Sequence, residues 1–273
     1  MRHLVRIWGN IGDAICAEPF VRELIARNPN DHVAIQSMAP TLYQTYPGVA
    51  EVYHLDEVVV RKRYDRYWFA RPDWHSHISA YFEKYKEYRV SYQPPRLYLP
   101  RVDISEFSIS WRRPVICIAA APSNPIRAWP MERWVELVRR LNERYTTVQL
   151  GQGEPPIDGV THCLVNRTTL IETAEILRRA RLLVSIDSGI SHLATAVGRR
   201  SIVLYGPVDP AIRAYAGYTI PVTAGKCTAC WPTYRGLKQC PQGHHSCMDI
   251  EVDTVLDAIL KEIRWIHDTG HSG

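Results

Sequence analysis

The feature that most constrains the fold is a regular alternation of short apolar runs with longer amphipathic stretches. The apolar runs cover residues 115–121, 146–151, 181–187 and 200–206. Between them, apolar residues recur at helical spacing over 130–145, 168–180 and 189–198. Because strands that alternate with helices pair in parallel, this pattern predicts an α/β fold with parallel sheets.

The amino-terminal part shows the same alternation in a weaker form. We expect strands at 2–8, 32–37 and 51–55, a tight turn "GNIGD" at 9–13 and a helix at 14–28. Residues 61–92 are rich in Arg, Tyr and Trp, and there we expect a helix around 74–87 and a strand near 88–92.

The alternation breaks over residues 100–114, "PRVDISEFSISWRRP", before a second β/α series begins. The second series ends in a helix at 253–270. A chain of 273 residues accommodates two domains of ordinary size. We therefore predict one domain over 1–112 and another over 113–273.

Composition and charge narrow the class of protein. Apolar residues make up 46% and charged residues 22%, as in a soluble globular protein. No apolar run approaches the ~20 residues of a membrane span, and the amino terminus has no continuous apolar core of a signal peptide. We therefore expect a cytoplasmic protein. The formal charge of +5 suits an anionic ligand, whereas the short, scattered basic runs argue against nucleic acid.

Two loops at predicted strand ends carry the first candidate residues, because ligands of open α/β sheets bind beyond the carboxyl ends of strands. Gly12 lets the backbone approach a ligand, and Asp13 stands at the start of a helix, where an acid either caps the helix or takes part in chemistry. Arg127 follows the strand at 115–121 and has a guanidinium that suits a phosphate, although a surface arginine is the alternative.

The third loop, "SIDSGISHLATAVG" at 185–198, is the strongest candidate. Asp187, Ser188 and Gly189 close a strand and open a helix, whose free N–H groups suit a diphosphate. His192 follows on the same helix face as Ser188, which favours a role in binding over a structural role.

Four cysteines cluster late in the chain with the spacing C-x2-C-x9-C-x6-C, namely Cys227, Cys230, Cys240 and Cys247. Thiolates at such spacing bind one tetrahedral ion, so we predict structural iron or zinc on these four residues. Disulfides and unligated thiols remain as alternatives, although a reducing compartment disfavours disulfides. The three other cysteines, Cys16, Cys117 and Cys163, are expected to be buried small apolar residues.

Several blocks in order resemble glycosyltransferase family 9, the family of ADP-heptose:lipopolysaccharide heptosyltransferases. The blocks are "GNIGDAICAEPFVREL", "IRAWPMERWVELVRRL" and "DSGISHLATAVG" with "YGPVDP", and the "CTAC…C…CM" cluster resembles the iron-binding finger of the autotransporter heptosyltransferase branch. The resemblance covers most of residues 4–26 and 115–260. It implies the GT-B fold class, with two Rossmann-like domains facing each other across a cleft.

The resemblance also implies a function, namely inverting transfer of a sugar from a nucleotide-sugar donor, with ADP-heptose expected, to a glycan or protein hydroxyl. Asp13 would be the general base. The residues implied on the donor side are Gly12, Ser123, Arg127, Glu154 of "GQGE", Asp187, Ser188, Gly189 and His192. No catalytic metal is implied, and a homo-oligomer is possible.

This chain departs from the family in two respects. Arg127 stands where lysine is usual, and residues 56–113, on the acceptor side, match no block. A degenerate member that binds sugar or nucleotide without turnover is therefore the alternative function. A zinc-ribbon protein that binds nucleic acid is a weaker alternative, because only Lys226, Arg235 and Lys238 lie near the cysteines.

Overall fold

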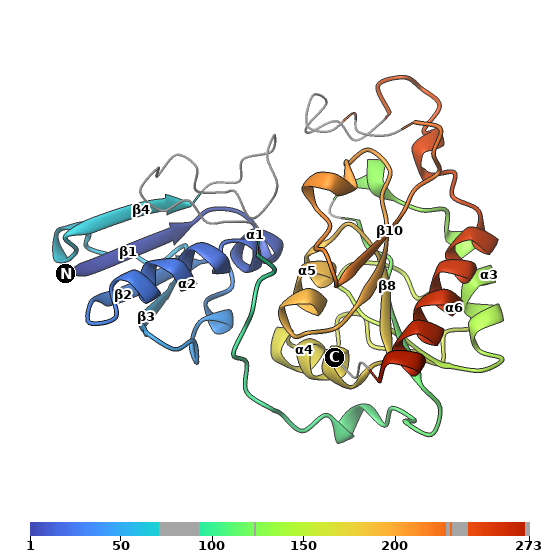
Figure 1. The fold of residues 1–273 in the computed structure, drawn as a ribbon, viewed down its shortest axis with the longest axis horizontal. Helices are drawn as coiled ribbons and strands as arrows, with labels where there is room; N and C mark the ends of the chain where they lie inside the picture. Colours follow the sequence, from blue (N-terminus) through green and yellow to red (C-terminus); the bar gives the residue numbers. More distant parts are fainter. Residues whose placement is uncertain (71–92, 123, 228–229, 231–239, 271–273) are drawn as a thin grey trace. The chain divides into compact units, whose positions relative to one another are not determined.

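The computed structural model describes the chain except for residues 71–92, 123, 228–229, 231–239 and 271–273. Its internal contacts divide the chain into two compact units, Met1–Arg101 and Val102–Gly273 (Figure 1). Residues 102–112, which the sequence analysis assigned to the first domain, have their contacts in the second unit. The helix expected around 74–87 and the strand expected near 88–92 lie outside the described residues.

The first unit is built on a sheet of four parallel strands in the order β3-β2-β1-β4. The strands are β1 (Arg2–Ile7), β2 (His32–Ser37), β3 (Val49–His54) and β4 (Arg66–Ala70). Three of them were predicted. The fourth was missed because β4 is an edge strand whose sequence, "RYWFA", alternates between exposed and buried residues without a long apolar run.

Two helices follow β1, where one helix over 14–28 was predicted. They are α1 (Ile11–Cys16) and α2 (Glu18–Arg27), separated at Ala17. Pro19 explains the break, because it has no N–H group to donate to the carbonyl of Ile15 in a continuous helix. The prediction was also wrong about the turn, since the helix already begins at Ile11 and places Asp13 in its first turn.

The second unit is built on a sheet of six parallel strands in the order β10-β9-β8-β5-β6-β7. The strands are β5 (Val115–Ala119), β6 (Thr146–Gln149), β7 (His162–Cys163), β8 (Leu182–Ile186), β9 (Ser201–Leu204) and β10 (Thr219–Val222). The edge strands β7 and β10 were not predicted, because β7 has two residues and β10 contains Pro221. This strand order is that of a Rossmann fold, with its switch point between β5 and β8.

Helices cover both faces of this second sheet (Figure 1). They are α3 (Met131–Leu141), α4 (Leu170–Arg179), α5 (Gly189–Ala196) and α6 (Val252–Thr269), so all four predicted helices are confirmed. In α3 the buried residues Trp134, Leu137, Val138 and Leu141 follow the helical repeat. They form one core with apolar residues of β5, β8, β9 and α6.

Short 3-10 turns complete the described structure, at Pro40–Leu42, Arg61–Arg63, Ser105–Phe107, Pro125–Arg127, Pro210–Ile212 and Ser246–Met248. The turn Pro125–Arg127 lies between β5 and α3, and Ser246–Met248 lies between the cysteines and α6. Among the described helices, none combines the length and the apolar content that crossing a bilayer requires.

Candidate functional site

The switch point of the second sheet brings two of the predicted loops to neighbouring strand ends. The loop after β5 carries Arg127, and the loop after β8 begins with Asp187. The chain runs from β5 toward one edge of the sheet and from β8 toward the other, so a crevice forms between these two loops. Topology therefore places both residues where this class of fold binds ligands.

Asp187 lies between a guanidinium and an imidazole at this position. The Nη1 atom of Arg127 is 3.1 Å from Asp187 Oδ2, and Nε2 of His192 is 3.9 Å from Asp187 Oδ1. All three side chains are largely buried, with 12% of the Arg127 side chain and 4% of the Asp187 side chain exposed. The geometry thus gathers a buried arginine and histidine around one carboxylate.

The ring of His192 is further oriented by Tyr215, which the sequence analysis did not single out. The two rings meet edge to face, with centroids 5.7 Å apart and an interplanar angle of 83°. Tyr215 is buried and comes from the loop after β9. No sequence signal marked this residue, because the contact joins helix α5 to the loop after β9, 23 residues further along the chain.

Helix α5 begins directly beside this cluster. Ser188 is its N-cap residue in extended conformation, and Gly189 is its first helical residue. The hydroxyl of Ser191 donates to the carbonyl of Ser188 at 2.7 Å and thereby fixes the first turn. The N–H groups at a helix start have no partner within the helix, so they present partial positive charge to an anion.

Glu154 lies in the loop after β6 and is held in an unfavourable environment. Burial raises the pKa of Glu154 to about 7, and the nearby Gln149 amide opposes this shift only in part. Among the described residues, neither Glu154 carboxylate oxygen has a partner at hydrogen-bond geometry. A buried carboxylate oxygen without a partner costs free energy, so the Glu154 carboxylate suits a ligand that brings hydroxyl or N–H donors.

The backbone around Glu154 is fixed by specific contacts. Gly151 has a φ of +152°, and a Cβ atom there would come within 2.1 Å of Glu154 Oε1. The buried Gln149 side chain donates to the carbonyl of Pro155 and accepts from the N–H of Ile157. The carboxylate therefore has room only because residue 151 is glycine.

A pocket of about 470 Å³ joins Glu154 to the loop after β5. Ala120, Ala121, Pro122, Pro125, Ala128, Trp129, Pro130, Met131, Trp134, Pro155 and His245 complete its lining. Its walls are mostly apolar, with Glu154 and His245 as the titratable groups, a composition typical of small-molecule sites. Ser123, which the resemblance assigns to the donor, lies outside the described residues.

In the first unit, Asp13 occupies the corresponding position after β1. Its Oδ2 atom accepts a hydrogen bond from the backbone N–H of Asn10 at 2.7 Å, so the carboxylate does cap its helix. A Cβ atom on Gly9 would lie 2.2 Å from the same oxygen, and Gly9 has a φ of +131°. Gly12 is the second residue of α1. Capping and chemistry are compatible, because one carboxylate has two oxygens.

All seven cysteines lie in the described part of the chain, and all of them are free thiols. Cys16 and Cys117 are buried as predicted, whereas Cys163 is only partly buried because it lies on the edge strand β7. Cys227, Cys230 and Cys240 are partly buried, and Cys247 is buried. Among the described residues, no three His, Cys, Asp or Glu side chains stand close enough together to hold a metal ion.

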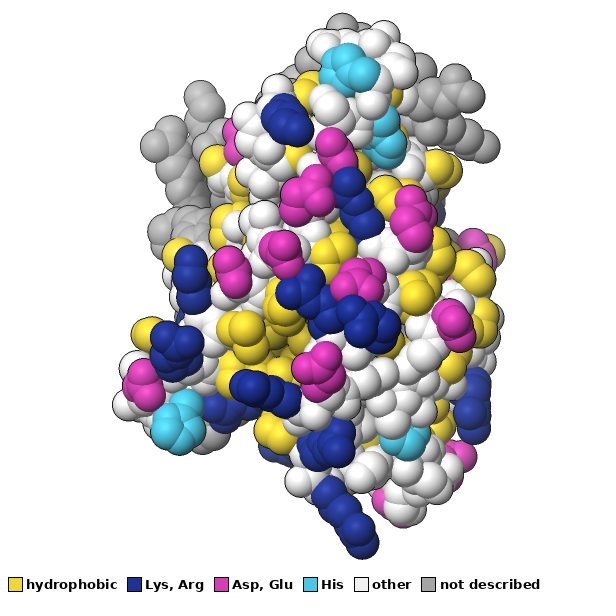
Figure 2. Space-filling model, turned by 90° about the vertical axis from the view of Figure 1, so that its right-hand side faces the viewer, with side chains coloured by type: hydrophobic (Ala, Val, Ile, Leu, Met, Phe, Trp, Pro, Cys, Tyr) yellow, Lys and Arg dark blue, Asp and Glu magenta, His cyan; other side chains and the backbone are white. Residues whose placement is uncertain are grey.

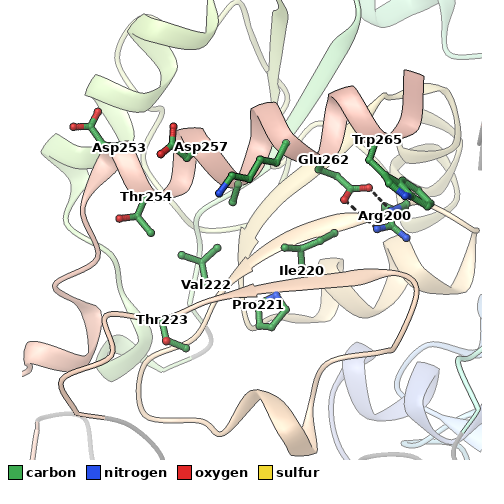
Figure 3. Close-up of a pocket in the computed structure, with 12 residues that line it drawn as sticks. Arg200, Ile220, Pro221, Val222, Thr223, Asp253, Thr254, Asp257, Glu262 and Trp265 are labelled. Atoms are coloured by element: carbon green, nitrogen blue, oxygen red, sulfur yellow. Dashed lines mark hydrogen bonds and ion pairs between the residues drawn. The ribbon is translucent and has the colours of Figure 1, made fainter. Parts of the chain in front are cut away.

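A larger groove of about 830 Å³ lies elsewhere in the second unit, between β10 and α6 (Figure 3). Its lining contains none of the predicted site residues. Its arginine, Arg200, is already engaged, because it pairs with Glu262 and stacks on Trp265 with its guanidinium carbon 4.2 Å from the ring centroid. Lys261 also lines this groove, whereas the predicted site residues Arg127, Asp187 and His192 come together at the switch point.

The surface charge on this side of the second unit is mixed. On the face that carries α3 and α6, acidic and basic side chains alternate over short distances (Figure 2). Surface pairs such as Arg139–Glu136 and Arg140–Asp253 account for part of this pattern. This face offers no extended basic field of the kind that nucleic acid requires.

Comparison with known proteins gives the family. The model of glycosyltransferase family 9 (heptosyltransferase) matches residues 82–226, more than half of the 273 residues. Lipopolysaccharide heptosyltransferase 1 of Salmonella typhimurium is 33% identical over 93 residues, which is 31% of this chain and 29% of that protein. The inactive autotransporter heptosyltransferase BimC of Burkholderia thailandensis is 27% identical over 146 residues, which is 50% of this chain and 34% of that protein. These matches thus span about a third of the relatives' own length.

The solved structures agree on the fold. The dodecameric iron-containing heptosyltransferase TibC of enterotoxigenic E. coli superposes with a TM-score of 0.77 at 16% identity, covering 98% of this chain and 78% of that chain. The predicted GT-B fold class is confirmed by this likeness. By its sequence match and its fold, the chain belongs to glycosyltransferase family 9, the heptosyltransferase family.

Proposed function

We propose that this chain is an inverting glycosyltransferase that moves heptose from ADP-heptose to a hydroxyl of a glycan or protein. The observation that carries the proposal is the buried Glu154, whose carboxylate has no hydrogen-bond partner among the described residues. The two hydroxyls of a ribose are donors of the right kind for it. Glu154 shares its pocket with the loop that carries Arg127, as a nucleotide with a diphosphate requires.

The remaining donor-side residues supply positive charge for the diphosphate. Arg127 brings a positive charge to the switch point, His192 brings an imidazole N–H donor, and Ser188 and Gly189 begin helix α5. In this proposal Asp187 holds Arg127 and His192 in place. Because these groups neutralise the leaving diphosphate, the proposal assigns no catalytic metal.

The reaction is a single displacement at the anomeric carbon. Asp13 takes the proton of the acceptor hydroxyl, and the hydroxyl oxygen attacks that carbon. The bond to the diphosphate oxygen breaks with its electron pair, and ADP leaves with the added charge held by Arg127 and helix α5. Attack from the face opposite the leaving group inverts the anomeric configuration.

The donor and acceptor classes come from relatives. TibC was solved with ADP-D-beta-D-heptose, and the Salmonella relative is named for lipopolysaccharide. An acceptor on a lipopolysaccharide glycan and an acceptor on a protein are both compatible with Asp13 as the base. Because TibC is dodecameric, we also propose that this chain assembles into a homo-oligomer, and its free thiols favour a cytoplasmic site of action.

A second candidate function is nucleotide-sugar binding without turnover. The specific observation in its favour is the similarity to BimC, which is described as inactive. Whether Asp13 acts as a general base decides between the two candidates.

Glu154 provides a test of the donor site. The carboxylate must be ionised to accept two ribose hydroxyls, and its pKa of about 7 in the empty pocket means that it ionises between pH 6 and pH 8. We expect ADP affinity, measured by calorimetry, to rise about tenfold from pH 6 to pH 8. Glu154→Gln should bind ADP more weakly and lose this pH dependence. If ADP affinity depends on pH as strongly in Glu154→Gln as in the wild type, the pH dependence comes from the nucleotide and not from Glu154.

The same residue makes an opposite prediction for stability. The pKa of Glu154 is higher in the folded chain than its ordinary value of 4.5, so the nucleotide-free protein loses stability as pH rises from about 4.5 to about 7. Glu154→Gln removes this loss. At pH 8 the variant should therefore melt at a higher temperature than the wild type while binding ADP less well, a trade-off that marks a ligand site.

The four late cysteines have the donor set that iron or zinc requires, and their electrostatics fit a cation. Burial, and after it the neighbouring thiols of Cys230, Cys227 and Cys240, raise the pKa of Cys247 to about 11. The pKa of Cys240 is lowered instead, mainly by the backbone N–H of His245. We propose that these four thiolates hold structural iron or zinc, which relieves their mutual repulsion.

Elemental analysis of protein purified without chelator tests this site. We expect about one iron or zinc per chain, and Cys240→Ser should lower that content severalfold. Cys163→Ser is the matched control, because Cys163 lies on β7 outside the cluster and should leave the metal content unchanged. Iron and zinc together far below one per wild-type chain would contradict the proposal.

A further inference from the structure

His245 links the end of the cysteine segment, residues 227–247, to the pocket that contains Glu154. It lies between Cys240 and Cys247, where its backbone adopts a φ of 50° and a ψ of 24°. This left-handed conformation is costly for a residue other than glycine or asparagine. Something in the folded structure therefore holds His245 in place.

The ring of His245 reaches across to the turn that precedes Arg127. Its Nε2 atom lies at hydrogen-bond distance from the carbonyl oxygen of Ile126. A carbonyl oxygen only accepts, so Nε2 carries the proton and donates. The turn Pro125–Arg127 uses two other carbonyls for its own closure, because Arg127 N–H donates to Asn124 and Ala128 N–H donates to Pro125. The carbonyl of Ile126 takes no part in this closure and accepts the hydrogen bond from His245.

A second contact fastens the same loop to the end of the cysteine segment. The indole N–H of Trp129 donates to the carbonyl of Ile250 at 2.9 Å. The segment is itself anchored on the sheet, because a Cβ atom on Gly206 would lie 2.2 Å from the sulfur of Met248. Residues 245–250 thus bridge the end of β9 and the loop after β5.

The bridge has one end beside the metal ligands and the other in the donor pocket. His245 lies five residues after Cys240 and two before Cys247, and its backbone N–H is the main cause that lowers the pKa of the Cys240 thiol. The side chain of His245 lines the same pocket of about 470 Å³ as Glu154 and Pro125. His245 is therefore the residue that joins the neighbourhood of Cys240 and Cys247 to the 125–127 turn.

We infer that His245 is a positioning residue for the donor: its ring fixes the carbonyl of Ile126 and thereby the place of Arg127, so that the stretch from Cys240 to His245 raises affinity for a nucleoside diphosphate. This inference rests on the proposed donor site. It adds that Cys240 influences donor affinity through the hydrogen bond from His245 to Ile126, while the contact of Trp129 with Ile250 holds the same loop independently of Cys240.

The first experiment compares ADP binding by calorimetry in the full chain and three variants. His245→Ala should lose about fivefold to tenfold in affinity, the usual effect of one such hydrogen bond. His244→Ala is the matched control and should stay within about twofold, because the His244 ring contacts only Gln242 and Ser246 among the described residues. Melting temperatures confirm that each variant is folded.

His245→Gly separates positioning from a merely structural role. Glycine adopts the left-handed backbone without cost, so this variant keeps the turn and loses only the ring. We expect it to melt no lower than the wild type and to lose ADP affinity as His245→Ala does. Wild-type ADP affinity in His245→Gly would overturn the inference, whereas absence of ADP binding by the wild type would instead overturn the proposed donor site.

The coupling to the cysteines is tested in a double-variant cycle. Cys240→Ser should weaken ADP binding about fivefold in the wild type and by less than about twofold when His245 is already glycine. The two losses are non-additive because both act through the same hydrogen bond. Additive losses would show that the cysteine segment and His245 act independently, and would overturn the coupling.

Discussion

Asp13→Asn is expected to lower acceptor-dependent release of ADP from ADP-heptose by about 10²- to 10⁴-fold, the usual contribution of a general base. The amide oxygen of asparagine still accepts the N–H of Asn10, so the cap at the start of α1 is retained. The loss should therefore appear in turnover, while the melting temperature and the affinity for ADP stay close to those of the wild type.

The assay requires two acceptors, heptose-free lipopolysaccharide and a serine-containing protein, each tested with wild type and variant. Asp31→Asn is the control. Asp31 lies at the amino-terminal end of β1, where it contacts His3 and the amino terminus, whereas Asp13 follows the carboxyl end of the strand. Undiminished transfer by Asp13→Asn would refute Asp13 as the base. Binding of ADP-heptose by the wild type without transfer to either acceptor would favour the binding-only function.

Arg127→Ala is expected to weaken ADP binding by about 100-fold, the second largest effect. The substitution removes a charged donor to the diphosphate, typically worth about 1.5–3 kcal/mol. It also leaves the buried Asp187 carboxylate facing the phosphates without the arginine that lies 3.1 Å away. Repulsion between the Asp187 carboxylate and the phosphates then lowers the ADP affinity further.

Two further variants separate these contributions. Arg127→Ala combined with Asp187→Asn should recover about tenfold of the lost affinity, because the repelling carboxylate is gone. Arg139→Ala is the matched control, since Arg139 makes an exposed pair with Glu136 on α3 and should leave ADP binding unchanged. Unaltered ADP affinity in Arg127→Ala would move the diphosphate away from this residue.

The sequence predicted the parts of the fold that repeat locally. A continuous apolar run predicts the buried strand "VICIA", and apolar residues at helical spacing predict the helix "MERWVELVRRL". The edge strands β4, β7 and β10 were missed because their stability comes from a neighbour rather than from their own pattern. The break at Ala17 was readable from Pro19, but the apolar periodicity over 14–28 outweighed it in the prediction.

For the candidate site, too, the sequence predicted single residues but not the contacts between distant segments. Asp13, Arg127 and the residues 187–192 could be proposed because each follows a predicted strand, and Glu154 could be proposed from the resemblance. The pairing of Arg127 with Asp187 joins residues 60 positions apart, and the bond from His245 to Ile126 spans 119 positions. Such contacts depend on how the loops are placed by the completed sheet, so local sequence carries no signal for them.

The most direct test of the account is a calorimetric titration of the wild-type chain with ADP, UDP and GDP, repeated with Arg127→Ala. The account predicts that ADP binds in preference to the other two nucleotides, and that Arg127→Ala removes most of this affinity. Equal binding of all three nucleotides would contradict the ADP-heptose donor. Binding of none, or ADP binding that survives in Arg127→Ala, would contradict a diphosphate site at the switch point of the second sheet.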